Sequence, residues 1–233
     1  MKYDANCFDL YGTLIDIRTD ESDPALWAAL AARYSAEGAS WTASALQAAY
    51  QEEAGRQPVK DTACPEIDLA PVFAALYRRR GIEPSAAQIA ETAWFFRRKS
   101  TSRLRLYAGV KELLAALRAQ GKVILLSNAQ HLFTMPELKR LGIDTAFDHI
   151  YISSDYGCKK PDPAFFALPL NEFGLLPERC LMIGNDPYCD ADGARSVGMD
   201  AWCIRTAISP QDAAPDRFDQ LRMNLKALQN RLC

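Results

Sequence analysis

Several features that define whole classes of protein are missing from this sequence. It has no excess of positive charge, because 27 lysine and arginine residues are balanced by 29 aspartate and glutamate residues, a net charge of −2. That balance gives no electrostatic reason to expect nucleic acid or an anionic membrane as a partner. No apolar run approaches the roughly 20 residues of a membrane-spanning helix, and the N-terminus carries no apolar signal region. We therefore expect a cytoplasmic protein without a membrane segment.

Histidine and paired cysteine are also scarce. Only two histidines occur, His131 and His149, and neither has a metal-binding neighbour at helical spacing, which disfavours histidine-based catalysis. The seven cysteines are scattered and include no Cys-x-x-Cys pair, so a disulfide framework or a zinc site is not expected. What remains is an ordinary globular composition, 49% hydrophobic and 24% charged, in 233 residues. That length suits one large domain, or one domain with an insert.

Residues 18–106 show one hydrophobic pattern. Apolar side chains recur there at the three- and four-residue spacing of about four amphipathic helices. Ser85, followed three residues later by Gln88, has the capping-box signature of a helix start. Two basic runs, Arg78–Arg80 and Arg97–Lys99, are interpreted as solvated helix ends. We predict an all-helical insert over residues 18–106.

Residues 1–17 and 107–233 show a different pattern, in which strands alternate with helices. Continuous apolar runs such as residues 123–126 suit parallel strands buried on both faces. This alternation predicts an α/β fold with three layers, a Rossmann-like parallel sheet between helices. The expected strands cover residues 5–9, 123–126, 150–152, 180–183 and 201–204, and the expected helices cover residues 110–117, 133–141, 163–173, 190–197 and 221–232.

Polar residues stand at the ends of four expected strands. Parallel strands end at a common edge of the sheet, and open α/β sheets bind ligands at that edge. Four polar strand ends meeting there indicate a functional site. The residues concerned are Asp9, Ser127–Asn128, Ser153–Ser154 and Asn185–Asp186.

The acids among them suggest nucleophilic and metal chemistry. A carboxylate such as that of Asp9 can form an acyl-phosphate or an ester intermediate, and the Thr13 hydroxyl could hold it in one rotamer. Asp9 and Asp186 together suit Mg²⁺, which prefers oxygen ligands. Asp190 could bind the metal directly, bind one of its water molecules, or cap a helix.

A serine and a pair of lysines could handle negative charge. Ser127 lies on a turn after a strand, where backbone N–H groups can face an anion. Lys159 and Lys160 are adjacent, and a lysine beside a nucleophilic carboxylate would lower the pKa of that carboxylate and neutralise phosphate charge. We expect one of these two lysines to do so and the other to be solvated.

Taken in chain order, these residues form four motifs. They are Asp-x-Tyr-Gly-Thr-Leu from Asp9, a strand followed by Ser-Asn, Lys-Pro-Asp-Pro from Lys160, and a strand followed by Gly-Asn-Asp-x-x-x-Asp. This order resembles the haloacid dehalogenase superfamily of hydrolases. The resemblance covers residues 1–17 and 107–233, and residues 18–106 lie where that family carries a helical cap.

The resemblance implies a role for each motif residue. Asp9 would be the nucleophile, Ser127 would bind the transferring group, and Lys160 would be the motif lysine because a proline follows it. Mg²⁺ would be the cofactor and a small molecule the substrate. The implied metal ligands are Asp9, Asp186, Asp190 and the backbone carbonyl of Tyr11, and the substrate-binding residues are Thr13 and Asn128.

Two positions depart from the pattern of the family's phosphatases. Tyr11 replaces a second aspartate that serves as general acid, a group that typically contributes roughly 10²–10⁴-fold in rate. A tyrosine there resembles the 2-haloacid dehalogenases, which need no metal and lack the full acidic fourth motif. Asn185 stands where an acid commonly follows the glycine, so the metal ligand could be shifted by one residue to Asp186.

Three functions therefore remain open. The leading hypothesis is a Mg²⁺-dependent phosphatase that acts on a small phosphorylated metabolite through an aspartyl-phosphate, as a monomer or homodimer. The second is a metal-independent 2-haloacid dehalogenase. The third is a weakly active or inactive relative that binds a phosphorylated metabolite or a partner protein. It ranks last because closely spaced acids destabilise a fold unless a cation compensates them.

Overall fold

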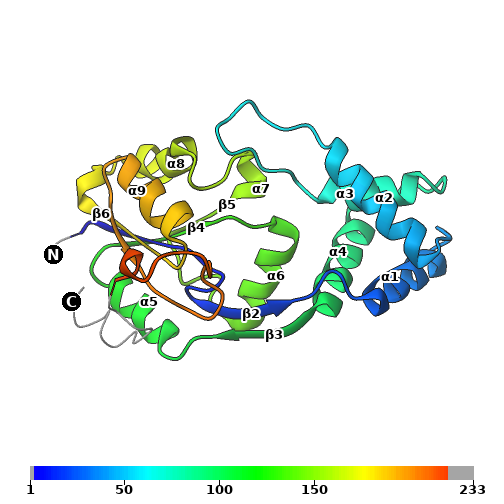
Figure 1. Ribbon diagram of the computed structural model, residues 1–233, viewed down its shortest axis with the longest axis horizontal. Coiled ribbons are helices and arrows are strands. Elements are labelled where there is room, and N and C mark those ends of the chain that lie inside the picture. The colour runs from blue at the N-terminus through cyan, green and yellow to red at the C-terminus, as the bar shows by residue number, and fades with distance from the viewer. Residues whose placement is uncertain (1–2, 220–233) are drawn as a thin grey trace.

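The computed structural model describes residues 3–219 and contains a five-stranded parallel sheet with helices on both faces (Figure 1). The strand order is β5-β4-β1-β6-β7, which places β1 at the centre. The predicted α/β architecture is confirmed. The strands are β1 (Ala5–Phe8), β4 (Lys122–Ser127), β5 (His149–Ile152), β6 (Cys180–Gly184) and β7 (Asp200–Cys203).

Alternate side chains of the strands fill two separate hydrophobic layers. On β4, Val123 and Leu125 belong to one layer, whereas Ile124 and Leu126 belong to the other. Burying each such side chain stabilises the fold by roughly 1.5–3 kcal/mol. The central sheet therefore provides a rigid base for the loops at its edge. Helices α5 (Val110–Arg118) and α6 (His131–Leu141) cover the first layer, and α8 (Pro163–Phe173) and α9 (Gly193–Ser196) cover the second.

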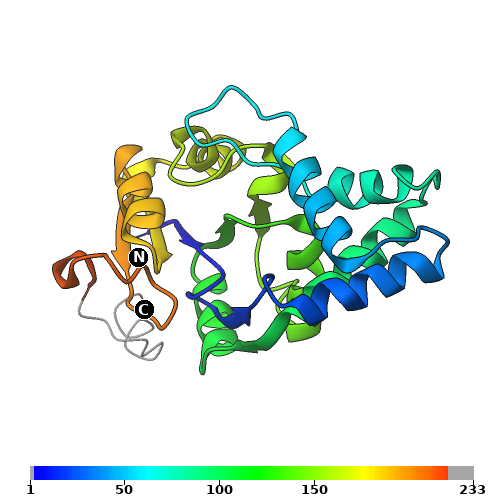
Figure 2. The same ribbon diagram turned by 45° about the vertical axis from the view of Figure 1, so that its right-hand side comes forward.

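Four helices form a bundle to one side of the sheet (Figures 1 and 2). Their buried aromatic side chains share a hydrophobic cluster, which includes Trp27, Tyr34 and Phe96. The predicted capping box starts the last helix, with Ser85 and Gln88 bonded reciprocally. The helices predicted between residues 18 and 106 are thus present. They are α1 (Pro24–Ala36), α2 (Ala43–Arg56), α3 (Ala70–Arg78) and α4 (Ala86–Ser100).

A two-stranded ribbon, which the sequence analysis did not predict, joins the bundle to the sheet (Figure 1). Strands β2 (Ile15–Thr19) and β3 (Thr101–Leu106) pair antiparallel. Leu104 and Leu106 alternate with arginines along β3, and this period of two is the signature of a strand. The inserted region is therefore not helical throughout, because its two ends form this ribbon.

A long loop makes a second connection between the bundle and the sheet. Residues 57–69, between α2 and α3, reach across to the segment after α7 (Ser153–Tyr156), as Figure 1 shows. Pro65 forms an antiparallel bridge with Cys158. The bundle is thus attached to the sheet through the ribbon and through this loop.

The C-terminal elements differ in detail from those expected. The helix predicted over residues 190–197 begins earlier, as a π-helix (Pro187–Asp192), and continues as α9. Short 3₁₀ turns occupy Pro177–Arg179 and Pro215–Arg217. The helix predicted over residues 221–232 lies outside the described residues. Within residues 3–219, none of the helices has the length and apolar character needed to cross a bilayer.

Candidate active site

Asp9 lies at the carboxyl edge of the sheet, directly after the central strand. Its side chain is 11% exposed and lines a cavity of about 270 Å³, which we call the Asp9 cavity. The Thr13 hydroxyl donates to Asp9 Oδ2 over 3.0 Å, the contact expected from the sequence. The carboxylate is therefore held in one orientation. The cavity is also lined by Tyr11, Asn128, Lys160, Asn185, Asp186, Cys189, Asp190, Ile208 and Pro210.

Gly12 makes the turn after Asp9 possible. Its φ is +87°, a region that L side chains rarely adopt. A Cβ atom at this position would also lie 2.4 Å from the side-chain amide of Asn185. The turn therefore needs glycine for its backbone angle and for its close approach to the loop after β6.

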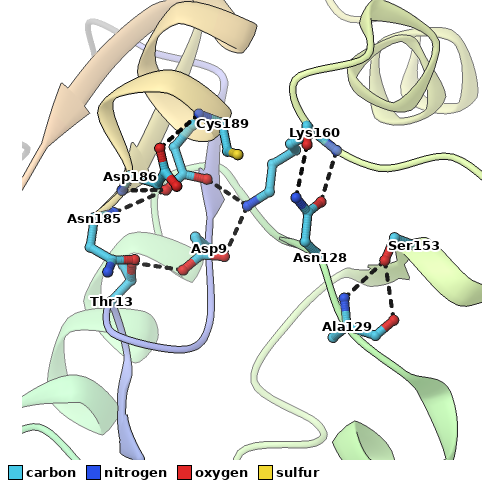
Figure 3. A network of polar contacts seen from close by, with 10 residues as sticks. Asp9, Thr13, Asn128, Ala129, Ser153, Lys160, Asn185, Asp186 and Cys189 are labelled. Atoms are coloured by element: carbon cyan, nitrogen blue, oxygen red, sulfur yellow. Dashed lines mark hydrogen bonds and ion pairs between the residues drawn. The ribbon is translucent and has the colours of Figure 1, made fainter. Parts of the chain in front are cut away.

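Lys160 lies between two carboxylates at this edge (Figure 3). Its Nζ donates to Asp9 Oδ1 over 2.9 Å and to Asp190 Oδ1 over 2.6 Å. The side chain is almost completely buried. Burial by itself lowers the pKa of Lys160, but Asp190 and Asp9 outweigh it and raise that pKa. The ammonium therefore stays charged beside Asp9.

Asn128 holds the backbone of Lys160 in place. Its Nδ2 donates to the Lys160 carbonyl, and its Oδ1 accepts the Lys160 N–H, both over 2.8 Å. Both polar atoms of the amide are thus engaged with the backbone. Asn128, expected to bind substrate, lines the Asp9 cavity, but its side chain forms hydrogen bonds with the loop that carries Lys160 (Figure 3).

Asp190 supports the loop after β6 as well as the lysine. Its Oδ2 accepts the N–H groups of Asn185 and Asp186 over 3.0 and 2.9 Å. A Cβ atom on Gly184 would lie 2.1 Å from this oxygen, so only glycine leaves room for it. Burial raises the pKa of Asp190, while Lys160 acts in the opposite direction. Both carboxylate oxygens of Asp190 thus have protein partners.

Asn185 and Asp186, the two candidate metal ligands after β6, have side chains that point to different partners. Asp186 Oδ1 accepts the N–H groups of Tyr188 and Cys189 over 2.8 and 2.9 Å, and so caps the π-helix. The Asn185 side chain turns toward Asp9 instead. Its amide lies 3.2 Å from Asp9 Oδ2 and 3.1 Å from the Tyr11 carbonyl oxygen. With its nitrogen toward these oxygens, the amide donates to both.

Ser127, at the end of β4, is completely buried. Its hydroxyl has no hydrogen-bond partner within residues 3–219. An unsatisfied buried polar group costs about 1–3 kcal/mol, so such a group in a native structure needs an explanation. A ligand that supplies the missing partner is one, although Ser127 itself does not line the Asp9 cavity.

Ser153 and Ser154, which were expected at the same edge, lie at the start of α7 and serve the backbone. Ser153 Oγ accepts the Ala129 N–H over 2.9 Å (Figure 3), and Ser154 Oγ accepts the His131 N–H over 2.9 Å. They fix the loop after β4 and do not line the Asp9 cavity.

The Tyr11 hydroxyl is bound on α6 and not at Asp9. It donates to Glu137 and lies 3.0 Å from Thr134 Oγ1. Glu137 in turn accepts a hydrogen bond from Arg97 Nε over 2.7 Å. Burial raises the pKa of Tyr11, and Glu137 raises it further, so this hydroxyl retains its proton.

The environment of Arg97 differs from the one expected from the sequence. The basic run Arg97–Lys99 was interpreted as a solvated helix end, but the Arg97 side chain is only 11% exposed. Its charge is tolerated because Glu137, which is 1% exposed, pairs with it. This pair could not be predicted from the sequence, since the two residues are 40 positions apart.

The oxygens around Asn185 form the set that best fits a divalent cation. Asp9 supplies a carboxylate, Tyr11 a backbone carbonyl, and Asn185 an amide oxygen if its side chain rotates. Mg²⁺ is usually bound by one or two carboxylates together with substrate phosphates, so this set suits it. No group of three His, Cys, Asp or Glu side chains in the described part of the chain is arranged to hold a metal. The carbonyl and the amide are therefore essential to the set.

Known proteins resemble this chain along most of its length. A family model for haloacid dehalogenase-like hydrolases matches residues 3–198. A phosphoserine phosphatase from Thermus thermophilus is 34% identical over 152 residues, which cover 64% of this chain and 59% of that protein. A phosphoglycolate phosphatase from Nitrosococcus oceani is 32% identical over 153 residues, which cover 63% and 68%. The chain thus spans about three fifths to two thirds of these relatives.

Solved structures agree with the sequence match. An L-2-haloacid dehalogenase superposes with a TM-score of 0.60 at 20% identity, covering 99% of this chain and 100% of that one. At this identity the similarity shows the fold. The family model, which matches well over half of the chain, shows more: this chain belongs to the haloacid dehalogenase-like hydrolases.

Proposed function

We propose that this hydrolase is a Mg²⁺-dependent phosphatase that acts on a small phosphorylated metabolite, with Asp9 as the nucleophile. The observation that carries the proposal is the buried Lys160 ammonium, 2.9 Å from an Asp9 carboxylate that lines an open cavity. The names of the two sequence relatives, a phosphoserine phosphatase and a phosphoglycolate phosphatase, support a phosphate ester as substrate.

In the first step, an Asp9 oxygen attacks phosphorus and the bond between phosphorus and the leaving-group oxygen breaks. Thr13 and Lys160 hold the carboxylate for in-line attack. The Lys160 ammonium offsets charge on the phosphoryl oxygens, and the Ser127 hydroxyl, which has no partner of its own, donates to one of them.

In the second step, water attacks the phosphorus of the aspartyl-phosphate. The bond to Asp9 breaks, inorganic phosphate leaves, and the carboxylate is restored. Because the Tyr11 hydroxyl is held by Glu137 with a raised pKa, we assign the proton on the departing oxygen to solvent. Leaving groups that depart without protonation are then favoured.

Mg²⁺ would be held by the Asp9 carboxylate, the Tyr11 carbonyl and the Asn185 amide oxygen. When bound, it neutralises negative charge on the phosphoryl group. Asp186, the acid next to Asn185 in the sequence, lines the same cavity and remains a candidate ligand. Asp190 keeps both of its oxygens on Lys160 and the backbone, so we assign it a supporting role in place of direct ligation.

We also propose the two functional regions expected from the sequence. Residues 1–17 and 107–233 form the catalytic core, and residues 18–106 form a cap that sets the choice of leaving group. Arg97 and the loop of residues 57–69 connect the two regions.

A 2-haloacid dehalogenase is the second candidate, and Tyr11 is the observation that favours it. In that reaction Asp9 would displace halide from carbon to give an ester, which water then hydrolyses. No metal would be required. Release of chloride from 2-chloropropionate in the presence of EDTA would support this candidate.

The test is hydrolysis of 4-nitrophenyl phosphate with Mg²⁺ and with EDTA, using wild type and Asp9→Asn. We expect turnover by the wild type with Mg²⁺ only, and none by the variant. Asp155→Asn, on the exposed side of α7, serves as the matched control and should behave like wild type. Equal turnover by Asp9→Asn and wild type would disprove the assignment of the nucleophile.

A further inference from the structure

A second cavity, of about 260 Å³, lies where α4, β3 and α6 meet, at the junction of the bundle and the sheet (Figure 1). It shares no lining residue with the Asp9 cavity. Its walls include four arginines, Arg97, Arg98, Arg103 and Arg140, and we call it the arginine cavity. One water molecule takes up about 30 Å³ of the liquid, so this space is large enough for a small molecule.

The acidic side chain in this cavity is already neutralised. Glu137 is the one acid among the described residues that line the cavity. It is 1% exposed and pairs with Arg97, whose Nε donates to it over 2.7 Å. The Tyr11 hydroxyl also donates to Glu137. The charges of Arg97 and Glu137 offset each other, and the other three arginines receive no compensation from the cavity wall.

Those three arginines keep a surplus of positive charge. Arg98 and Arg140 are exposed, and the side chain of neither forms an ion pair or a hydrogen bond with another residue between positions 3 and 219. Arg103 Nη1 lies 3.5 Å from Asp16 Oδ2, but Arg105 Nη2 lies closer to the same oxygen, at 2.8 Å. Because one carboxylate offsets only one of these two arginines, the surplus comprises the charges of Arg98, Arg103 and Arg140.

Helix dipoles explain only part of this arrangement. Arg98 and Arg140 lie in the last turns of α4 and α6, where the negative end of a helix favours a cation. Lys99 and Lys139 occupy the same two turns but do not line the cavity. Arg103 lies on β3, outside both helices. The dipoles account for basic residues in these turns, but not for three guanidinium groups around one space.

The chemistry of the wall favours a phosphorylated anion. Like charges that line one cavity attract an ion of the opposite sign, and planar guanidinium groups bind phosphoryl oxygens in a bidentate manner. A phosphoryl group carries about 1.5–2 negative charges at pH 7, so two linked phosphoryl groups match the charge of three arginines. The hydroxyls of Thr101 and Ser102 already donate to backbone carbonyls, which leaves the arginines as the main donors.

We propose that the arginine cavity binds a small molecule that contains a diphosphate group, at a site separate from Asp9. Such an anion contacts the bundle through Arg98, the ribbon through Arg103 and α6 through Arg140. It therefore strengthens the junction between the bundle and the sheet. The inference does not depend on the proposed phosphatase function, because it uses none of the residues assigned to the chemistry.

The test is isothermal titration calorimetry of the full chain with inorganic pyrophosphate, in EDTA so that no Mg²⁺-dependent hydrolysis occurs. We expect one pyrophosphate to bind per chain. We expect orthophosphate to bind at least about tenfold more weakly, the size of the effect when one charged hydrogen bond is lost.

Four variants assign the binding to its residues. Arg98→Gln and Arg140→Gln should each raise the Kd for pyrophosphate by about tenfold. Lys99→Gln and Lys139→Gln remove the same charge from the same two helix turns, and should bind pyrophosphate like wild type. Because the side chains of Arg98 and Arg140 have no ion-pair or hydrogen-bond partner in the described part of the chain, their variants should keep the wild-type Tm.

Three results would overturn the proposal. Unchanged binding by both arginine variants would place pyrophosphate elsewhere, for example in the Asp9 cavity. Equal weakening by the arginine and lysine variants would show a response to net charge and not to this cavity. Equal affinity for orthophosphate and pyrophosphate would exclude a diphosphate group as the feature that is recognised.

Discussion

Two buried ionic clusters meet at the turn after β1, and they differ in what they connect. The Asp9 cluster (Asp9, Lys160, Asp190) joins loops at one edge of the sheet. The Arg97 cluster (Tyr11, Glu137, Arg97) joins that turn to α6 and to α4 of the bundle. Both obey the rule that a buried charge needs a charged partner. One orients Asp9, the proposed nucleophile, whereas the other fixes the bundle against the sheet.

The largest effect should come from removing the centre of the Asp9 cluster. Lys160→Met leaves two buried carboxylates without their shared cation, and breaking a buried ion pair typically costs about 3–5 kcal/mol. We expect the free energy of unfolding, measured by urea denaturation, to fall by that amount, and turnover to be lost.

The neighbouring lysine provides the control for this variant. Lys159 is 40% exposed and lies 3.7 Å from Glu66, so Lys159→Met should cost less than about 1 kcal/mol. Equal stability of the two variants would show that the Asp9 cluster does not depend on the buried ammonium.

A smaller effect is expected in the Arg97 cluster. Tyr11→Phe removes a donor to Glu137 and a partner of Thr134, which should lower the free energy of unfolding by about 1–3 kcal/mol. If the hydroxyl were the general acid, kcat for an alkyl phosphate would fall by roughly 10²–10⁴-fold. We expect a fall of less than about tenfold. A loss in the larger range would move Tyr11 from the Arg97 cluster into the chemistry.

The smallest effect is expected for two serine hydroxyls, Ser127 Oγ, which we propose binds a ligand, and Ser153 Oγ, which stabilises the fold. Ser127 Oγ has no partner within residues 3–219, whereas Ser153 Oγ is bonded to Ala129. Ser127→Ala should therefore raise the free energy of unfolding by about 1 kcal/mol while lowering kcat/KM, and Ser153→Ala should lower the free energy of unfolding by about 1 kcal/mol. Destabilisation by both substitutions would contradict this assignment of Ser127.

The Asp9 cluster could be placed from the sequence because each member follows a strand or a motif. Parallel strands end at one edge, so a residue's position after its strand fixes its place in the molecule. Asp9 and Lys160 come together for this reason, although they are 151 positions apart. The same rule failed for Ser153, because a strand end fixes position but not the direction of a side chain.

The Arg97 cluster could not be placed, because it depends on how two regions pack together. Nothing in the helical pattern of residues 86–100 distinguishes a buried arginine from its exposed neighbours. The ribbon of β2 and β3 was missed for another reason. Its alternation of apolar and charged residues is visible in the sequence, but it is short and stands next to much longer helical patterns.

The central claim is that Asp9 becomes phosphorylated during turnover. The most direct measurement is mass spectrometry of the peptide that contains Asp9, after a reaction with 4-nitrophenyl phosphate and Mg²⁺ is stopped with acid. We predict that a phosphoryl group is found on Asp9 of the wild type and is absent from Asp9→Asn. Turnover with no phosphoryl group on Asp9, or with one on another residue, would contradict the account.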